Sequence, residues 1–264
     1  MGRIAGYDFR RRAAAPTLPD IPTVIERQIM KDQRIIVIGG TSGIGLESAR
    51  RFAQLGASVT VTGRDAAKGA ALDVPGVRFA QLDAARRAQC DAFFADHGPF
   101  DHLVVCASGA AGAGAFRDLA LDDLQAGFDG KFWPQLNALQ ASLSGIAAGG
   151  SATLVGAISA RAQQPGTAGL AAINGALEAM LPILASELRP LRVNMVAPGV
   201  IDTPWWHRVP DAQRSRLFEE MGAAVPAGRV GTAADVADVI VMLAGNTFIT
   251  GSVIDVDGGW KLRR

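Results

Sequence analysis

The stretch that decides the fold is Arg34 to Gly45, which reads RIIVIGGTSGIG. A β-branched run at 35–38 leads directly into glycines at positions 39, 40, 43 and 45, and apolar residues then recur with helical spacing at Leu46, Ala49 and Phe52. Strand, glycine turn and helix form the context that a dinucleotide-binding loop requires. Glycine lets the backbone approach a pyrophosphate, and the helix N-terminus offers free N–H groups and a positive dipole end. The sequence therefore predicts a phosphate-binding turn here.

The length and composition of the chain fit one α/β domain. Its 264 residues are enough to bury a large core, and 49% are hydrophobic while only 19% are charged. Such a composition suits parallel strands that are covered on both faces. The formal net charge of +1 gives no reason to expect nucleic acid or an anionic membrane as a partner.

The cysteines and histidines indicate neither a disulfide framework nor a metal site. Cys90 and Cys106 are the only cysteines, and His97, His102 and His207 do not form a ligand pattern. The lack of a disulfide framework favours a reducing compartment, so we expect a cytoplasmic protein. We also expect no apolar run of membrane-spanning length.

The N-terminal segment differs in composition from the rest. Residues 1–29 are rich in arginine and proline and lack periodicity until about Ile21, so we expect a flexible extension there. Residues 30–264 are predicted to form the dinucleotide-binding domain, with a substrate loop at about 200–225.

Apolar runs and helical patterns alternate along the whole domain. This alternation predicts right-handed crossovers and a single-domain Rossmann-type doubly wound parallel sheet, with ligands beyond the carboxyl ends of the strands. The predicted strands are 34–38, 58–62, 77–82, 101–105, 151–156, 191–197 and 252–256; the predicted helices are 44–55, 84–97, 119–147, 166–189, 211–221 and 232–244. Pro182 is expected to kink or break its helix.

The spacing Gly39-x3-Gly43-x-Gly45 resembles the TGxxxGIG loop of the short-chain dehydrogenase/reductase family, with Ile38 where the family usually has threonine. The resemblance extends over residues 31–260 and includes the run RVNMVAPGVIDTP and the C-terminal ITGSVIDVDGG. It implies a nicotinamide dinucleotide cofactor held by Gly39, Thr41, Ser42, Gly43, Ile44, Gly45, Arg64, Asp83, Ala107, Pro198, Gly199 and Thr203.

The end of the second predicted strand favours NADP(H) over NAD(H). An acidic residue at this point would bind the ribose 2′-hydroxyl of NAD, but the strand ends in Gly63 and Arg64 follows. A guanidinium suits a 2′-phosphate. The alternative is that Arg64 is a solvated cation stacking on adenine.

At the positions where the family usually has its catalytic residues, the resemblance places other residue types in this chain. Members usually carry a Tyr-x-x-x-Lys pair, a serine and an asparagine, but the single tyrosine here is Tyr7, in the extension. The match places other residue types at the serine, tyrosine, lysine and asparagine positions: Ala157, Leu170, Asn174 and Lys131, respectively. A leucine cannot donate a proton to a developing alkoxide.

The remaining candidates for proton transfer are Lys131, Ser159 and His207. Lys131 would extend into the space that the smaller side chains of Leu170 and Asn174 leave open. The alternative is that it forms an ion pair or lies on a solvated face. Ser159 would share a face with Ala157 if the strand continues, or else sit in a turn. His207 is an acid–base candidate or a surface residue. Trp205 and Trp206 suggest a bulky or apolar small-molecule substrate, or packing of a lid.

The sequence leaves several functions open. The first is an NADP(H)-dependent oxidoreductase with a non-standard proton-transfer site, passing hydride to a carbonyl, an activated C=C or a C=N. The alternatives are a non-redox cyclase or isomerase, and a catalytically silent nucleotide-binding subunit or sensor. By resemblance, the long helices at 124–147 and 166–189 imply a homodimer or homotetramer.

Overall fold

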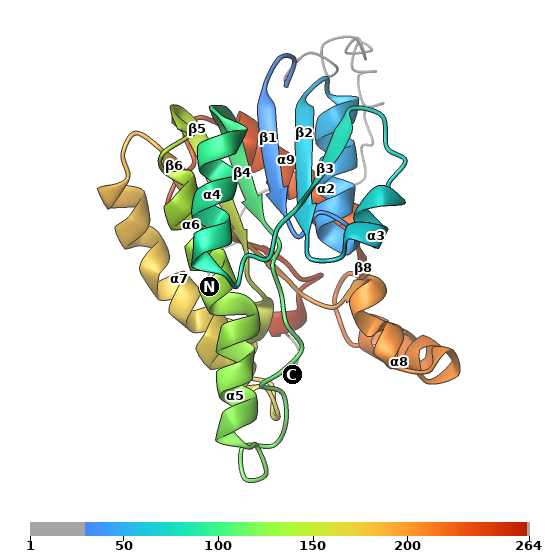
Figure 1. Ribbon diagram of the computed structural model, residues 1–264. Helices are drawn as coiled ribbons and strands as arrows, with labels where there is room; N and C mark the ends of the chain where they lie inside the picture. The colour runs from blue at the N-terminus through green and yellow to red at the C-terminus, as the bar shows by residue number, and fades with distance from the viewer. Residues whose placement is uncertain (1–29, 263–264) are drawn as a thin grey trace, which may run out of the picture.

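The computed structural model describes residues 30–262 of the chain, and the expected extension at 1–29 lies outside them. A seven-stranded parallel sheet with the order β3-β2-β1-β4-β5-β6-β9 forms the centre (Figure 1). Its strands are β1 (Arg34–Ile38), β2 (Ser58–Gly63), β3 (Val77–Gln81), β4 (Phe100–Val105), β5 (Ile146–Val155), β6 (Arg192–Pro198) and β9 (Val253–Val256). A small second sheet pairs β7 (Ile201–Asp202) with β8 (Gly231–Thr232). The predicted doubly wound parallel fold is confirmed.

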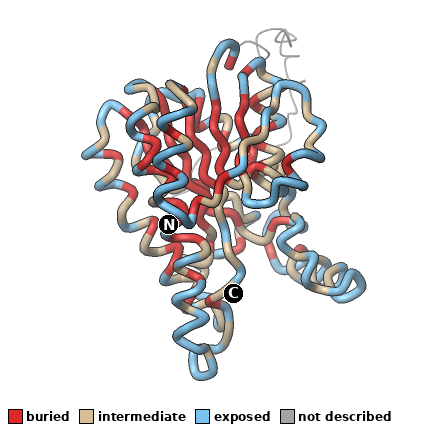
Figure 2. The backbone as a smooth tube through the Cα atoms, in the orientation of Figure 1, coloured by how far each residue is buried: buried red, intermediate tan, exposed pale blue. Residues whose placement is uncertain are grey.

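Helices cover both faces of this sheet, because side chains alternate along each buried strand. In β1, Ile35 and Val37 belong to one core cluster while Ile36 and Ile38 belong to the other. Figure 2 shows the buried strands at the centre and the exposed backbone around them. The helices are α2 (Gly43–Gln54), α3 (Ala66–Ala70), α4 (Arg87–His97), α5 (Leu121–Gly127), α6 (Trp133–Ser142), α7 (Ala168–Glu187), α8 (Asp211–Ala223) and α9 (Ala233–Gly245).

The prediction of one continuous helix over 119–147 is wrong in two respects: the segment is interrupted, and it ends earlier. The segment is divided into α5, a π-helical turn at Phe128–Phe132 and α6, and strand β5 already begins at Ile146. A π-helical turn widens the helix by one residue and redirects its side chains. In this way the turn rotates the side chains on either side of it relative to one another.

Helix α7 runs unbroken through Pro182, so the predicted local break is wrong. Pro182 is exposed and near the end of the helix, whereas Leu181 and Ala185 beside it are buried. The lost hydrogen bond therefore falls on the solvent side, where water can satisfy the free carbonyl, and packing holds the helix together.

Helix α7 is also the one helix in the described part of the chain that could cross a membrane by length and composition. Its mean hydropathy reaches 1.5, which corrects our expectation that no apolar run is long enough. One such helix is weak evidence, because the core helix of a soluble protein passes the same test. Ile173, Leu177 and Leu181 lie in the core cluster on one face of the central sheet.

Candidate active site

A cleft of about 960 Å³ opens at the carboxyl ends of the strands. Helices α5 and α8 extend beyond the sheet (Figure 1), and residues of both helices line the cleft. All the residues predicted to bind the cofactor line it, as do Lys131 and Ser159. Ala157, Leu170 and Asn174, which the resemblance places at the family's serine, tyrosine and lysine positions, line it too. His207 does not line it and is exposed. The structure therefore brings the predicted site together except for His207.

The glycine turn forms a cradle that larger residues would fill. Gly39 and Gly43 have φ angles of 77° and 54°, in the region that favours glycine. A Cβ on Gly45 would lie 2.3 Å from the Gly39 carbonyl oxygen. The side chain of Ser42 does not cap α2, so the first N–H groups of this helix are left for a ligand. This geometry fits a bound phosphate or pyrophosphate.

Cationic side chains line the cleft where β2 ends. Arg64 and Lys68 both line it, and neither side chain has a hydrogen bond or ion pair with another described residue. Asp65 lies between them but accepts a hydrogen bond of 3.1 Å from the backbone N–H of Lys68, so its carboxylate caps α3. Two unpaired cations fit an additional phosphate group. Sequence reasoning missed Lys68, although its i+4 spacing from Arg64 was visible.

Lys131 reaches the cleft from the π-helical turn between α5 and α6. Its side chain is buried, and its Nζ donates a hydrogen bond of 2.9 Å to the carbonyl oxygen of Gly156. No carboxylate pairs with it among the described residues, so it forms neither the ion pair nor the solvated face considered above. Burial lowers the pKa of Lys131 to about 8, which lets the amine gain or lose a proton near neutral pH.

Cys106, at the end of β4, is the ionisable neighbour of Lys131 in the cleft wall. Burial raises the pKa of the Cys106 thiol to about 12, so the thiol stays neutral beside the ammonium. Sequence reasoning treated Cys106 only as a free cysteine. Its position directly after a predicted central strand was the signal that could have placed it at the site.

Ser159 and Asn174 lie in the same wall and are hydrogen-bonded to each other. Strand β5 ends at Val155, and Ser159 follows in a 3₁₀ turn at Ile158–Ala160, so the strand does not continue as one alternative required. The Asn174 amide donates to Ser159 Oγ at 3.1 Å and to the Leu170 carbonyl oxygen at 2.8 Å. Its Oδ1 is buried without a partner among the described residues, which leaves one acceptor for a ligand or water.

The segment after β7 covers the cleft with aromatic side chains. Trp205 and Trp206 meet edge to face with ring centroids 4.8 Å apart, and Trp206 packs similarly on Phe218 of α8. The Trp206 indole donates a hydrogen bond of 3.1 Å to the Ile201 carbonyl oxygen. Both tryptophans line the cleft, so they pack against each other and also offer apolar surface to a ligand.

Comparisons with known proteins identify the family. Residues 39–261 match the sequence family described as enoyl-(acyl carrier protein) reductase. A 3-oxoacyl-(acyl-carrier-protein) reductase of Chlamydia muridarum is 30% identical over 248 residues, which cover 88% of this chain and 98% of that protein. The 2,3-dihydroxy-2,3-dihydro-p-cumate dehydrogenase of Pseudomonas putida is 32% identical, with 87% of this chain and 95% of that protein covered.

Solved structures agree with this assignment. A crystal structure of a small-chain dehydrogenase in complex with NADPH is similar to this chain with a TM-score of 0.76 and 32% identity, covering 88% of this chain and all of that one. The chain belongs to the short-chain dehydrogenase/reductase family and is an oxidoreductase of that type.

Proposed function

We propose that this enzyme is an NADP(H)-dependent reductase in which Lys131 replaces the family's usual tyrosine as proton donor. The buried, hydrogen-bonded ammonium of Lys131 in the cleft is the observation that carries this proposal. The substrate class is a carbonyl, an activated C=C or a C=N in a small molecule with a bulky or apolar body. The residues at the usual serine, tyrosine and lysine positions, Ala157, Leu170 and Asn174, have no acidic proton to give.

The cofactor assignment is supported by the cradle at the glycine turn and by the unpaired cations beyond it. The N-terminus of α2 would hold the pyrophosphate, and Arg64 with Lys68 would hold the 2′-phosphate. When bound, the reduced nicotinamide supplies the hydride. The similar small-chain dehydrogenase that was crystallised with NADPH supports the choice of NADP(H) over NAD(H).

Lys131 would act by holding a proton at Nζ and presenting it to the atom that gains negative charge. The carbonyl of Gly156 fixes the ammonium in one place, which lowers the reorganisation needed during reaction. Because the Lys131 side chain is buried, its ammonium would interact more strongly with a developing oxyanion than it would in solution. A pKa of about 8 also leaves it protonated at neutral pH and acidic enough to donate.

The test is NADPH oxidation against a panel of ketones, quinones, enones and imines, with the wild type and Lys131→Met. We expect Lys131→Met to lower the rate at least a hundredfold while NADPH still binds. Lys31→Met, an exposed lysine away from the cleft, is the matched control and should keep full activity.

Other outcomes would contradict the proposal. Tight NADPH binding without turnover of any substrate would indicate a silent nucleotide binder. Product formation without net cofactor oxidation would indicate a cyclase or isomerase. Unchanged reduction by Lys131→Met would show that another group, such as Ser159, supplies the proton.

We also propose a cytoplasmic homodimer or homotetramer. The exposed side of α7 supports this, because Ile183 on that helix is 57% exposed although it is apolar. The unpaired cysteines support a reducing compartment. Light scattering of the purified protein would report the assembly, and a monomer at micromolar concentration would contradict it.

A further inference from the structure

A second, smaller cavity of about 230 Å³ adjoins the main cleft, and we call it the side cavity. It lies between the end of α8, the β7–β8 pair and the turn after β9. Val200, Ile201, Met221 and Trp260 line both spaces, so these four residues form the boundary between them. At ~30 Å³ per water, the side cavity has room for about seven water-sized groups, enough for a short alkyl segment or one ring.

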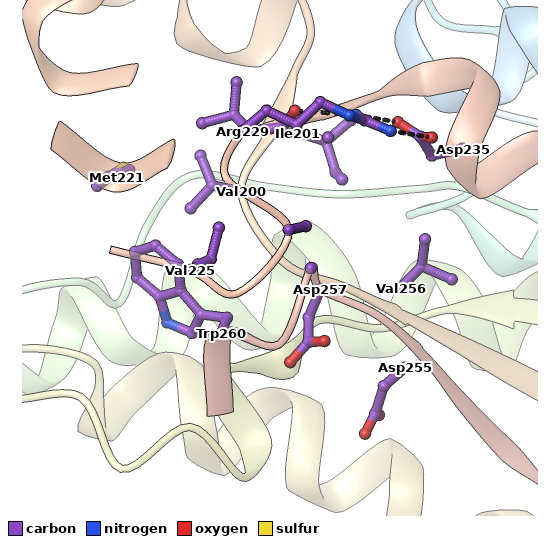
Figure 3. A pocket seen from close by; sticks show the side chains of 14 residues that line it. Val200, Ile201, Met221, Val225, Arg229, Asp235, Asp255, Val256, Asp257 and Trp260 are labelled. Atoms are coloured by element: carbon purple, nitrogen blue, oxygen red, sulfur yellow. Dashed lines mark hydrogen bonds and ion pairs between the residues drawn. The ribbon is translucent and has the colours of Figure 1, made fainter. Parts of the chain in front are cut away.

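The wall of the side cavity next to the cleft is apolar. Figure 3 shows Trp260, Val225, Val200 and Met221 gathered on one side, with the Arg229–Asp235 ion pair on the other. Trp260 and Val225 are buried and form a small hydrophobic cluster with Ile158, against which Val200 and Met221 pack. A chain entering from the cleft would therefore meet hydrocarbon and an indole ring first.

The charged residues that line the side cavity already have partners within the protein. Arg229 makes hydrogen bonds of 2.7 and 2.8 Å to the two carboxylate oxygens of Asp235. Asp255 pairs with Arg161 and Lys261. Asp257 accepts from the backbone N–H groups of Gly259 at 2.9 Å and Lys261 at 3.1 Å. An anionic ligand would find no unpaired cation among these residues, and an apolar group would disturb none of these bonds.

We propose that the side cavity is the far end of the substrate site and takes the terminal, neutral apolar part of an elongated substrate. The reacting end of that substrate would lie near Lys131 in the main cleft, and its tail would pass between Met221 and Trp260. This inference rests on the proposed function, because it treats the main cleft as the place where the substrate reacts. It adds the substrate class: a small molecule with an uncharged alkyl or ring tail.

The test uses unreactive probes, so that it does not depend on turnover. Linear 1-alkanols of four to ten carbons are titrated by calorimetry into the protein saturated with NADPH. Because this cofactor is already reduced, it cannot accept hydride from the alcohol. We expect the affinity to rise about fourfold per added methylene, until the chain reaches the end of the side cavity.

The variants Ala227→Phe and Val225→Phe fill the side cavity from two positions of its wall. In either variant the affinity should stop rising at a shorter chain length than in the wild type. Ala223→Phe is the matched control, since Ala223 is exposed and lines neither space, and it should leave the chain-length series unchanged. Val225 is buried, so its variant could fail to fold; Ala227 is exposed, so its variant keeps the test decisive.

A series that levels off at the same chain length in the wild type and in Ala227→Phe would overturn the side cavity proposal. A separate titration with NADPH fluorescence tests the proposed function. If NADPH does not bind, the proposed function fails, and the alkanol series on the unloaded protein still tests the side cavity alone.

Discussion

The ammonium of Lys131 has one hydrogen bond to a backbone carbonyl and little contact with water. Because burial lowers its pKa to about 8, the protonated form dominates below that pH and is lost above it. If Lys131 donates the proton during reduction, kcat/KM should be level below pH 8 and fall about tenfold per pH unit above it. A pH profile of NADPH oxidation measures this.

A control for this pH dependence is the affinity for NADPH over the same range. It should change far less than the rate, because in the proposed mechanism Lys131 acts on the substrate and not on the phosphates of the cofactor. A rate that stays level to pH 10 would remove Lys131 from the proton-donating role.

The position of Arg64 in the cleft leads to a separate prediction about cofactor choice. Arg64→Ala should weaken NADPH binding at least tenfold and change NADH binding little, because only NADPH carries the 2′-phosphate. Fluorescence titration with both cofactors measures the ratio. Arg216→Ala, an exposed arginine that does not line the cleft, is the control. Equal losses for both cofactors would contradict a 2′-phosphate role.

At the residue scale, the sequence predicted which side chains reach the cleft better than it predicted their surroundings. Lys131 was found by resemblance, but its burial depends on the π-helical turn, which no local pattern announced. His207 is exposed, as the surface alternative expected, and its neighbours Trp205 and Trp206 line the cleft in its place. Hydrogen bonds such as Asn174 to Ser159 join residues whose relative position depends on tertiary packing.

At the scale of elements, the turn between β1 and α2 depends on the absence of side chains. Gly45→Ala would place a methyl group 2.3 Å from the Gly39 carbonyl oxygen, and backbone cannot yield as a flexible side chain could. We expect this variant to lose about 2 kcal/mol of unfolding free energy and most of its NADPH affinity. Urea denaturation and cofactor titration measure the two effects.

The matched variant is Gly175→Ala in helix α7, where an added Cβ meets nothing within 4 Å. Here alanine should raise the unfolding free energy by about 0.5–1 kcal/mol through its better helix propensity. Equal stability of the two variants would contradict this explanation, because it would show that the close approach of Gly45 to Gly39 does not require glycine.

The strands of the central sheet could be predicted to within a few residues, except for the early start of β5 at Ile146, because buried parallel strands are continuous apolar runs. The two-residue strands β7 and β8 were missed. The helices were less predictable where tertiary contacts override local preference. Pro182 does not break α7 because the opposite side of the helix is held in the core. Helix α3 was missed because it has only five residues and begins with a capping aspartate in a turn.

At the scale of the whole molecule, Arg161 joins segments that are far apart in the chain. Its guanidinium pairs with Glu178 of α7 at 3.0 Å and with Asp255 of β9, which also pairs with Lys261. Asp255 and Glu178 are only 14% and 15% exposed at their side chains. This network ties the last strand and the turn after it to the body of the fold.

Removing Arg161, the centre of this network, should therefore lower the free energy of unfolding more than breaking an exposed ion pair does. Arg161→Met should lower the unfolding free energy by about 1–2 kcal/mol, because two carboxylates lose a partner in a partly buried place. Arg50→Met, which breaks an exposed pair with Glu47, should change it by about 0.3 kcal/mol. Thermal and urea unfolding of both variants measure the difference, and equal effects would contradict the role of the network.

The order of the residues along the chain has a consequence for how the protein is made. Trp260 is the last of the residues that line the cleft, and it follows β9, which is added to the sheet beside β6. During synthesis, the glycine turn and the first strands emerge long before the boundary between the cleft and the side cavity exists. The residues predicted to hold the dinucleotide end at Thr203, so all of them are synthesised before Trp260. The boundary next to the side cavity is therefore the last part of the site that translation completes.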